Sequence, residues 1–186
     1  MDKKQMKLEN PKRLEELNPQ GTLKRIGFQR SHVLCDIGAG SGIFTLPAAK
    51  MTDEVVYAVE ANSEMLKIIE GKAKDEKINN IKYVYVEDDH FDIKGKSVDF
   101  VLLVTVLHEI EGKSVFMKEI ERLLNDQGKI AVIEFHKRET PMGPPIPHRI
   151  SKEDVLSALA DIDFEVQDEF ELGENFYCLT FARKDK

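Results

Sequence analysis

The sequence has only two cysteines and no long apolar run, and both scarcities restrict the classes of protein to which it can belong. Cys35 and Cys178 each stand inside an apolar run that predicts a strand, without a second cysteine at metal-binding spacing. We interpret both as buried thiols. The longest uncharged run, residues 37–49, holds three glycines and a proline and is far shorter than the roughly 20 apolar residues that span a membrane. The sequence therefore predicts no membrane span.

A secretion signal and an excess of positive charge are also missing. The N-terminal lysines are not followed by an apolar segment, so we expect a cytoplasmic protein. Lys and Arg total 27 against 34 Asp and Glu, which gives a net charge of -7. Such a charge disfavours nonspecific binding to nucleic acid or to an anionic membrane, and we expect neither as a partner. No His-Glu-x-x-His motif occurs, and no metal site is predicted.

The composition is that of a folded globular protein. Hydrophobic residues make up 41% of the 186 residues and charged residues 33%, which is too apolar for general disorder. A chain of this length is enough for one domain with a buried core. We therefore expect a single domain over residues 1–186.

Apolar strands and amphipathic helices alternate along the chain. Runs that predict buried strands lie at residues 32–37, 55–59, 81–86, 98–106 and 129–135. Three helical patterns lie between these strands, the first at residues 43–50. The second begins at an N-cap at Ser63 and has on one face Met65, Leu66, Ile69 and Ala73. The third ends near residues 125–128 and has the apolar residues Phe116, Ile120, Leu123 and Leu124. This alternation predicts parallel strands joined by helices.

The last part of the chain predicts a helix and a hairpin. A capping box at Ser151 and Asp154 opens a helix through residue 160. The side chains that this helix turns inward are Val155, Leu156 and Leu159. Strands at residues 164–172 and 176–183 follow. Because the turn between them is too short for a parallel crossover, we expect them to be antiparallel.

These elements predict an α/β fold, namely a Rossmann-like, seven-stranded, mostly parallel sheet with an antiparallel C-terminal hairpin and helices on both faces. Residues 31–186 form this core within the single domain. Residues 1–30 are an N-terminal helical segment, in which residues 11–27 predict one or two short helices interrupted at Pro19. This segment could serve as a flap or lid.

Three glycines, Gly38, Gly40 and Gly42, lie between the first strand and the first helix. Ligands of such sheets bind here, beyond the carboxyl ends of the strands. Glycine lets the backbone approach a ligand, and free N–H groups at the helix start are donors for it. The spacing is G-x-G-x-G, with Ile43 where a dinucleotide-binding loop would have its third glycine. This departure disfavours a nicotinamide dinucleotide.

Acidic residues stand at three successive strand ends. Asp36 precedes the glycines, where it would repel a pyrophosphate but favour a cation. Glu60 ends the second strand, where a carboxylate accepts hydrogen bonds from ribose hydroxyls. Glu87, Asp88 and Asp89 follow the third strand, where a carboxylate can accept from an adenine amino group. The three positions together indicate a cationic ligand that carries adenosine.

At these positions the sequence resembles the class I S-adenosylmethionine-dependent methyltransferases. The resemblance covers nearly the whole chain, and the segments that resemble the five successive motifs of that family are residues 36–42, 59–60, 87–88, 98–109 and 123–128. Within the family, Leu107-His108-Glu109 and the proline-rich segment that begins at Pro141 resemble small single-domain enzymes of the ubiquinone/menaquinone-biosynthesis type.

The resemblance implies S-adenosylmethionine as the cofactor and assigns residues to it. Asp36 would lie near its cationic amino-acid end, and Glu60 on its ribose hydroxyls. Either Glu87 or Asp88 would contact the adenine, because spacing favours the first and residue type the second. The other implied cofactor-binding positions are Gly38, Ala39, Gly40, Gly42, Ala61 and Thr105, the last of which stands where related sequences often have Asn.

His108 follows the fourth strand and is the candidate catalytic residue, a general base for acceptors that must lose a proton. A capping or shaping role for this histidine is the alternative. The segment 136–150 contains four of the seven prolines and is either a lid over the acceptor or a plain connector. No large insertion offers further binding surface, so we expect a compact acceptor.

These residues predict methyl transfer from S-adenosylmethionine to a small-molecule acceptor. Two other functions stay open. The protein could bind S-adenosylmethionine without catalysis, as a sensor or partner subunit, or it could be an NAD-dependent oxidoreductase with a divergent glycine loop. Binding of S-adenosylmethionine compared with NAD, followed by a screen of methyl acceptors, distinguishes the three.

Overall fold

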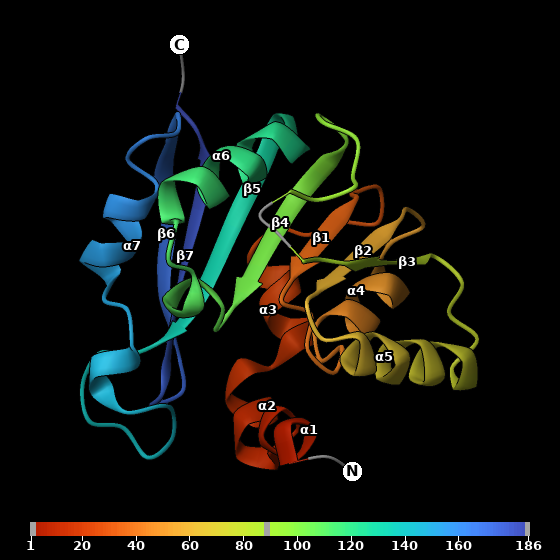
Figure 1. Cartoon of the computed structure of the whole chain (residues 1–186), viewed down its shortest axis with the longest axis horizontal. Helices are drawn as coiled ribbons and strands as arrows, with labels where there is room; N and C mark the ends of the chain where they lie inside the picture. The colour runs from red at the N-terminus through yellow and green to blue at the C-terminus, as the bar shows by residue number, and fades with distance from the viewer. Residues whose placement is uncertain (1–2, 88–89, 185–186) are drawn as a thin grey trace. The chain divides into compact units, whose positions relative to one another are not determined.

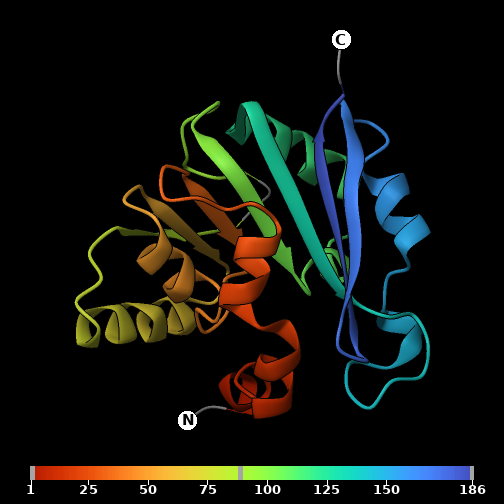
Figure 2. The same ribbon diagram turned by 180° about the vertical axis from the view of Figure 1, so that it is seen from behind.

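The computed structural model describes residues 3–87 and 90–184. These residues fall into two compact units, Met1–Asp92 and Ile93–Lys186. Figures 1 and 2 show the elements of each unit from opposite sides. Within the two described ranges, no helix has the length and apolar character needed to cross a membrane.

The first unit contains three parallel strands, β1 (Leu34–Ile37), β2 (Val56–Glu60) and β3 (Ile81–Tyr85). Leu34 pairs with Val56, which pairs in turn with Ile81, so the carboxyl ends of the three strands lie on one edge. β1 is buried at every position, as its apolar sequence predicts. The three predicted strands are confirmed, each within two residues of its expected bounds.

Two helices, α4 (Thr45–Met51) and α5 (Ser63–Asp75), follow the first two strands. The side chains that α5 buries are Met65, Leu66, Ile69 and Ala73, as their spacing predicts. The expected N-cap at Ser63 is wrong. The cap is Asn62, whose side chain accepts a hydrogen bond from the backbone N–H of Glu64 at 3.0 Å. Asn62 has the extended backbone that a cap needs, whereas Ser63 is already helical.

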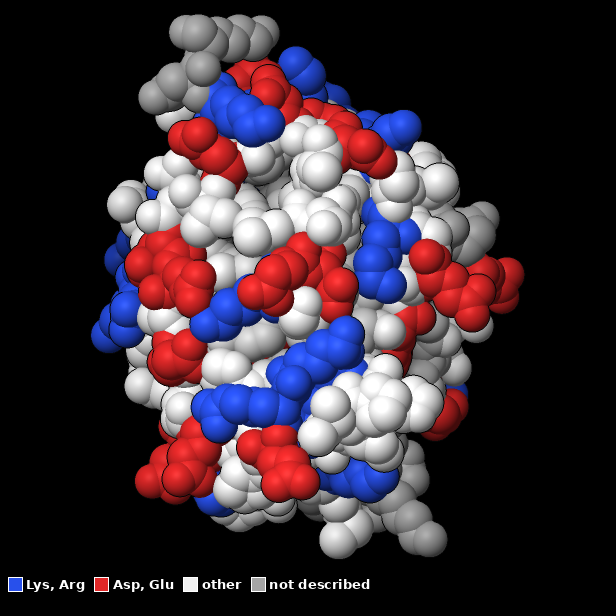
Figure 3. Space-filling view, turned by 90° about the vertical axis from the view of Figure 1, so that its left-hand side faces the viewer, with Lys and Arg blue, Asp and Glu red and all other residues white. Residues whose placement is uncertain are grey.

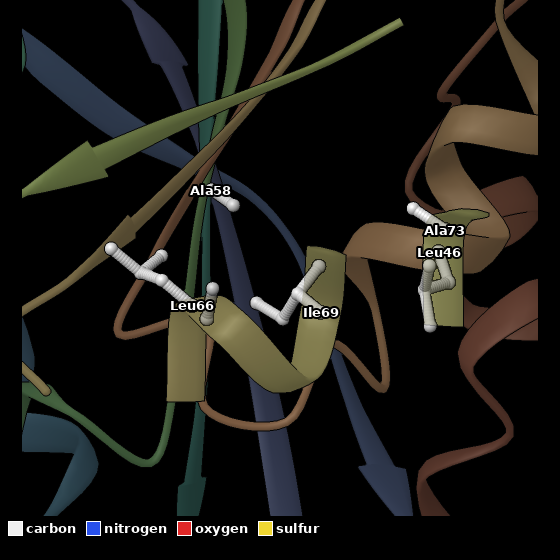
Figure 4. Close-up of a cluster of buried hydrophobic side chains, with 6 residues drawn as sticks. Leu46, Ala58, Leu66, Ile69 and Ala73 are labelled. Atoms are coloured by element: carbon white, nitrogen blue, oxygen red, sulfur yellow. The ribbon is translucent and has the colours of Figure 1, made fainter. Parts of the chain in front are cut away.

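The helices of this unit pack on its strands through a small apolar core. Its members are Ala39, Leu46, Ala58, Leu66, Ile69 and Ala73. Figure 4 shows Leu66 and Ile69 on α5, together with Ala58 of β2. Full burial of a leucine or isoleucine side chain contributes about 1.5–3 kcal/mol to stability. Because Ala39 belongs to this core, the glycine loop is anchored to it.

Three short helices precede β1, namely α1 (Lys3–Leu8), α2 (Pro11–Leu17) and α3 (Pro19–Arg25) (Figure 2). The last two confirm the expected short helices broken at Pro19. Asn18 separates them, because it is the left-handed C-cap of α2 with φ of 37° and its side chain accepts from the N–H of Gly21 in α3 at 3.4 Å. Helix α1 lies within the expected N-terminal helical segment 1–30, but outside residues 11–27, whose pattern predicts the short helices.

The second unit contains four strands, β4 (Val98–Val104), β5 (Leu124–Phe135), β6 (Phe164–Leu172) and β7 (Phe176–Arg183). β4 and β5 are parallel, and β7 is antiparallel to both β5 and β6. The predicted hairpin is confirmed with its expected bounds. The expected end of the preceding helix is wrong. Leu124 is extended and pairs with Val98, so it and residues 125–128 belong to β5.

Helices α6 (Lys113–Leu123) and α7 (Lys152–Ala158) belong to this unit, and its loops contain the 3-10 turns η1 (Leu107–Glu109) and η2 (Ile146–His148). The capping box is confirmed, since Ser151 and Asp154 each accept the other's backbone N–H at 3.1 Å. The inward orientation expected for Leu156 is wrong. It is 44% exposed, because it lies about 100° around the helix from Val155, which is buried together with Leu159.

The strands follow the order β3-β2-β1-β4-β5-β7-β6 along the sheet. This order, with β7 as the antiparallel strand, confirms the predicted Rossmann-like α/β fold with a C-terminal hairpin. Cys35 in β1 and Cys178 in β7 are both buried free thiols, as expected.

Candidate functional site

The glycine loop between β1 and α4 has three glycines in the left-handed region, with φ of 72° at Gly38, 54° at Gly40 and 84° at Gly42. Residues with a Cβ rarely adopt these values, which is why glycine stands at each position. The sequence predicts free N–H groups here, and for most of the loop this prediction is wrong, because the N–H groups already have acceptors within the protein. Gly38 and Ala39 donate to the carbonyl of Val59, and Gly42 donates to that of Ala39. The loop is therefore held by its own backbone.

Glu60 at the end of β2 fastens the loop further. Its Oε2 accepts from the backbone N–H of Gly40 at 2.8 Å, and its Oε1 accepts from that of Asn62 at 3.0 Å. The residue is 8% exposed. Each carboxylate oxygen can accept two hydrogen bonds, so one acceptor position on each remains for a ligand hydroxyl. The structure thus brings together Gly40 and Glu60, two of the expected cofactor-binding residues.

Asp36 is 2% exposed in β1, and its Oδ2 accepts from the hydroxyl of Thr45 at 2.6 Å. Burial raises the pKa of Asp36 to about 7; hydrogen bonds from Thr45 oppose this rise, and the negative charge of Glu60 adds to it. Among the residues that the structure describes, no Lys, Arg or His forms an ion pair with Asp36. A cationic ligand would supply the missing counter-charge.

These two carboxylates fit the cofactor that the sequence implies. Asp36 would hold a cationic group of S-adenosylmethionine, and Glu60 would accept from its ribose hydroxyls. A dinucleotide fits less well, because its pyrophosphate is anionic and would meet two buried negative groups.

Helix α1 packs on the glycine loop. A Cβ atom added at Gly40 would lie 2.9 Å from Cδ1 of Leu8. The next residue, Glu9, forms an ion pair with Lys72 of α5 at 2.7 Å, and the same ammonium group donates to the carbonyl of Ser41 in the loop at 2.9 Å. One lysine therefore ties α1, the glycine loop and α5 together within the first unit.

The remaining expected positions of the first unit have different surroundings. The side chain of Ala39 packs into the apolar core, so it can contact a ligand only through its backbone. Ala61 and Glu87 are exposed. Asp88, the alternative adenine contact, lies outside the described residues, as does Asp89.

Thr105 follows β4 in the second unit and has φ of 55°. A β-branched residue in this region is strained, because its Cβ substituents crowd the backbone. Its N–H donates to the carbonyl of Ile133 at 2.7 Å, which holds the end of β4 beside β5. Asparagine tolerates a left-handed backbone better than threonine does.

His108 lies in η1, just beyond β4, and contacts Glu134 near the end of β5. Its Nδ1 is 2.8 Å from Oε2 of Glu134, and its backbone N–H donates to Oε1 at 3.2 Å. Burial acts to lower the pKa of His108, but the hydrogen bond and charge of Glu134 and the charge of Glu109 raise it overall, against an opposing effect of Lys113. Glu134 was missed by sequence reasoning. Its signal is a charged residue inside an apolar strand run.

A pocket of about 540 Å³ is lined by His108 in the second unit. Its walls come from η1, the start of α6, η2 and α7. The polar lining includes Lys113, Ser114 and His148, whereas Ile150 is apolar. The volume falls in the range of small-molecule sites.

Arg149 holds the segment 136–150 from inside and is 8% exposed. The acceptors of its guanidinium, at 2.6–3.3 Å, are the carbonyls of His136, Arg138, Met142 and Pro144 and the hydroxyl of Thr140. So many hydrogen bonds within one segment favour a fixed wall over a mobile lid. Residues 147–150 of this segment line the pocket.

Charges of both signs lie side by side on the face of the molecule shown in Figure 3. The second unit pairs many of its charges. Lys152 contacts Glu169 at 2.6 Å and Glu171 at 2.9 Å, and Lys137 contacts Asp154 at 3.0 Å. The face in Figure 3 therefore presents no broad patch of a single sign.

The sequence matches the family model of the methyltransferase domain over residues 35–132, just over half of the chain. The chain belongs to the methyltransferase domain family. The matched range of this methyltransferase domain includes the glycine loop, Glu60 and His108 and ends within β5.

Individual relatives agree with the family. The ubiquinone/menaquinone biosynthesis C-methyltransferase of Haemophilus ducreyi is 26% identical over 128 residues, which cover 67% of this chain and 48% of that protein. The chain thus spans about half the length of the curated relatives it matches. A structure of an S-adenosylmethionine-dependent methyltransferase from Aquifex aeolicus is 26% identical, with a TM-score of 0.91 over 99% of this chain and 100% of its own. These matches confirm S-adenosylmethionine as the cofactor of the family.

The fold alone does not define the reaction. The [4+2]-cyclase SpnF is similar to this chain with a TM-score of 0.78 at 16% identity, over 90% of this chain and 81% of its own. At that identity the likeness shows the fold only, and one fold can host different reactions. The acceptor side must therefore be argued from the residues of this chain.

Proposed function

We propose that the protein transfers a methyl group from S-adenosylmethionine to a compact small-molecule acceptor, with His108 as general base. The observation that carries this proposal is the pair of buried carboxylates at the glycine loop, Asp36 and Glu60, whose charges no cation of the described residues balances. The pocket lined by His108 has a volume suited to a small acceptor.

When bound, S-adenosylmethionine supplies a methyl group on a positively charged sulfur, so the acceptor needs an electron pair aligned with the carbon–sulfur bond. The residues of the chain bind and orient the two reactants, which can lower the barrier by about 7–11 kcal/mol. Where the acceptor must first lose a proton, a general base adds about 10²–10⁴-fold in rate. His108 is the residue we propose for that step.

Calorimetric binding of S-adenosylmethionine to Glu60→Ala tests the cofactor site. The substitution removes hydrogen bonds to a charged acceptor, each worth about 1.5–3 kcal/mol, so binding should weaken roughly 10- to 100-fold. Glu64→Ala is the matched control, because Glu64 is an exposed glutamate of α5 that pairs with Lys67. It should bind as the wild type does. Thermal melting of both variants checks that loss of the Gly40 hydrogen bond has not unfolded the protein.

Two outcomes would contradict the proposal. Binding of NAD without binding of S-adenosylmethionine would favour the oxidoreductase. Tight binding of S-adenosylmethionine with no transfer to quinol, phenol, thiol or arsenite acceptors would favour the sensor. The cytoplasmic location and the lack of a nucleic-acid partner stay predictions from the composition.

A further inference from the structure

Glu134 holds His108 through two hydrogen bonds at once. Oε2 accepts from the imidazole Nδ1 at 2.8 Å, and Oε1 accepts from the backbone N–H at 3.2 Å. The carboxylate is 1% exposed, and within the described residues its side chain has no other hydrogen-bond or ion-pair partner. Burial of a carboxylate is costly unless it is paired. A buried carboxylate whose hydrogen bonds within the described residues all go to one histidine points to a role for that histidine.

The same contacts fix which ring nitrogen carries the proton. An ionised carboxylate can only accept hydrogen bonds, so neutral His108 carries its proton on Nδ1. Nε2 then keeps a free lone pair. Nδ1 is bound to Glu134, whereas Oε1 of Glu109 lies 3.8 Å from Nε2, beyond hydrogen-bond distance. Because the residue lines the pocket, Nε2 is the nitrogen available to a bound molecule.

The charges around His108 favour uptake of a proton. Glu134 on β5 and Glu109 on η1 are negative, and Lys113 on α6 is positive. The other titratable or charged groups nearby, on the pocket wall or beside Glu134, are His148, Arg149, Asp154, Asp161 and Tyr177. Three of these are already bound, Arg149 to the segment 136–150, Asp154 to Lys137 and Asp161 to Ser114. The two glutamates outweigh burial and Lys113, so the pKa of His108 lies above its ordinary value.

We propose that Glu134 is a positioning residue that sets His108 to accept a proton at Nε2, and that the acceptor therefore carries an acidic O–H, S–H or C–H group. This inference rests on the proposed methyl transfer. The acceptor's proton moves to Nε2, and the electron pair left on the acceptor forms the new bond to the methyl carbon. The carbon–sulfur bond breaks with its electron pair on sulfur, which loses its positive charge. The proton stays on the imidazolium beside Glu134 until water removes it.

NMR of the ligand-free protein tests the pair directly with Glu134→Gln. The backbone N–H of His108 still needs an oxygen acceptor, so the amide NH₂ of the new side chain turns to Nδ1 and donates to it. The neutral ring must then carry its proton on Nε2. We expect the imidazole nitrogen shifts to change from the Nδ1–H to the Nε2–H tautomer, and the pKa of His108 to fall by about one unit or more.

A control and a conservative variant complete the NMR experiment. Glu165→Gln changes an exposed glutamate of β6 and should leave both the tautomer and the pKa of His108 unchanged. Glu134→Asp keeps a carboxylate and should keep the Nδ1–H tautomer. An unchanged tautomer and pKa in Glu134→Gln would overturn the inference.

Kinetics separate positioning from folding. With phenols, thiols and 1,3-dicarbonyl compounds as acceptors, Glu134→Gln should lower kcat about 10²–10⁴-fold while KM for S-adenosylmethionine stays the same. With primary amines, whose free base already presents a lone pair, the same variant should lose little activity. An equal loss with both classes would overturn the assignment of an acidic acceptor.

The two proposals fail in different ways. If the wild type shows the Nδ1–H tautomer and Glu134→Gln reverses it, but no acceptor of either class is methylated, the proposed function and the acceptor class are overturned. The NMR result would then still support Glu134 as the residue that positions His108.

Discussion

Asp36 and Glu134 are both buried carboxylates, but their partners differ. Glu134 contacts an imidazole that can carry a positive charge, whereas Asp36 contacts the neutral hydroxyl of Thr45. A buried ion without a counter-charge has a raised free energy relative to its protonated form. Asp36 is therefore destabilised as an anion until a cationic ligand arrives.

The stability of the ligand-free protein should fall as the pH rises from about 4 to about 7. The pKa of Asp36 is raised by burial from 3.8 to about 7, so in this range the folded protein binds a proton that the unfolded chain has released. The destabilisation is complete above the folded pKa, with an upper limit of about 4 kcal/mol. In denaturant melts, the difference in unfolding free energy between wild type and Asp36→Asn should change across this pH range. A difference between them that does not change with pH would contradict the prediction.

Thr105→Asn should stabilise the protein by about 1 kcal/mol, because asparagine adopts the left-handed backbone with less strain. Thr105→Val is the matched control, since it keeps the β-branched shape and should give no gain. The midpoint of denaturant unfolding measures both. Greater stability of the valine variant than of the asparagine variant would show that backbone strain is not the dominant effect.

At the scale of elements, the segment 136–150 is ordered by Arg149, which itself belongs to the segment. Arg149 donates to four carbonyl groups and to the hydroxyl of Thr140, all of them within this segment. These hydrogen bonds within one segment differ from the packing of α4 and α5, which apolar contacts hold against the strands of the first unit. This part of the pocket wall is thus held by hydrogen bonds more than by hydrophobic burial.

Arg149→Lys should destabilise the protein by about 2–3 kcal/mol, because a single ammonium group cannot reach the acceptors that the planar guanidinium spans. Limited proteolysis should also cut within residues 136–150 more readily. Arg138→Lys is the control, since the Arg138 side chain is exposed and only its carbonyl binds Arg149. Its stability and its digestion pattern should match the wild type; similar losses in both variants would speak against the role of Arg149.

Most strands could be predicted because a buried parallel strand reads as a continuous apolar run. The start of β5 could not, since residues 125–128 are polar and lie in the register irregularity between the pairs Val98–Leu124 and Phe100–Lys129. The sequence pattern of helix α1 is equally weak. Its contact with Gly40 forms only in the folded protein, so the sequence does not predict it. Sequence places Asp36 and Glu60 at strand ends, and parallel register then brings them to one edge.

The pairing of His108 with Glu134 could not be read from the sequence. The two residues are 26 positions apart, His108 in η1 after β4 and Glu134 in β5, and the pairing of β4 with β5 brings them together. The pocket is harder still, because its walls come from four elements. Residue types at strand ends were thus predictable, whereas their partners were not.

At the scale of the whole chain, the two compact units contain different parts of the proposed chemistry. The first unit holds the glycine loop with Asp36 and Glu60, and the second holds His108, Glu134 and the pocket. The two sites have different readouts, because Glu60→Ala is measured by binding of S-adenosylmethionine and Glu134→Gln by the tautomer and pKa of His108. The experiments on Glu60 and Glu134 therefore test cofactor binding and proton removal separately.

The backbone hydrogen bonds of the glycine loop have a consequence for the product of the reaction. Gly38, Ala39 and Gly40 are already fastened to Val59 and Glu60, so the entropy of ordering the loop, about 1–2 kcal/mol per residue, is lost during folding and not when a ligand arrives. A loop that is ordered before ligand binding should bind the demethylated cofactor about as well as the methylated one. Because methyl transfer leaves unchanged the cationic amino-acid end proposed to lie near Asp36, we expect the product of the proposed reaction to compete with S-adenosylmethionine for this loop.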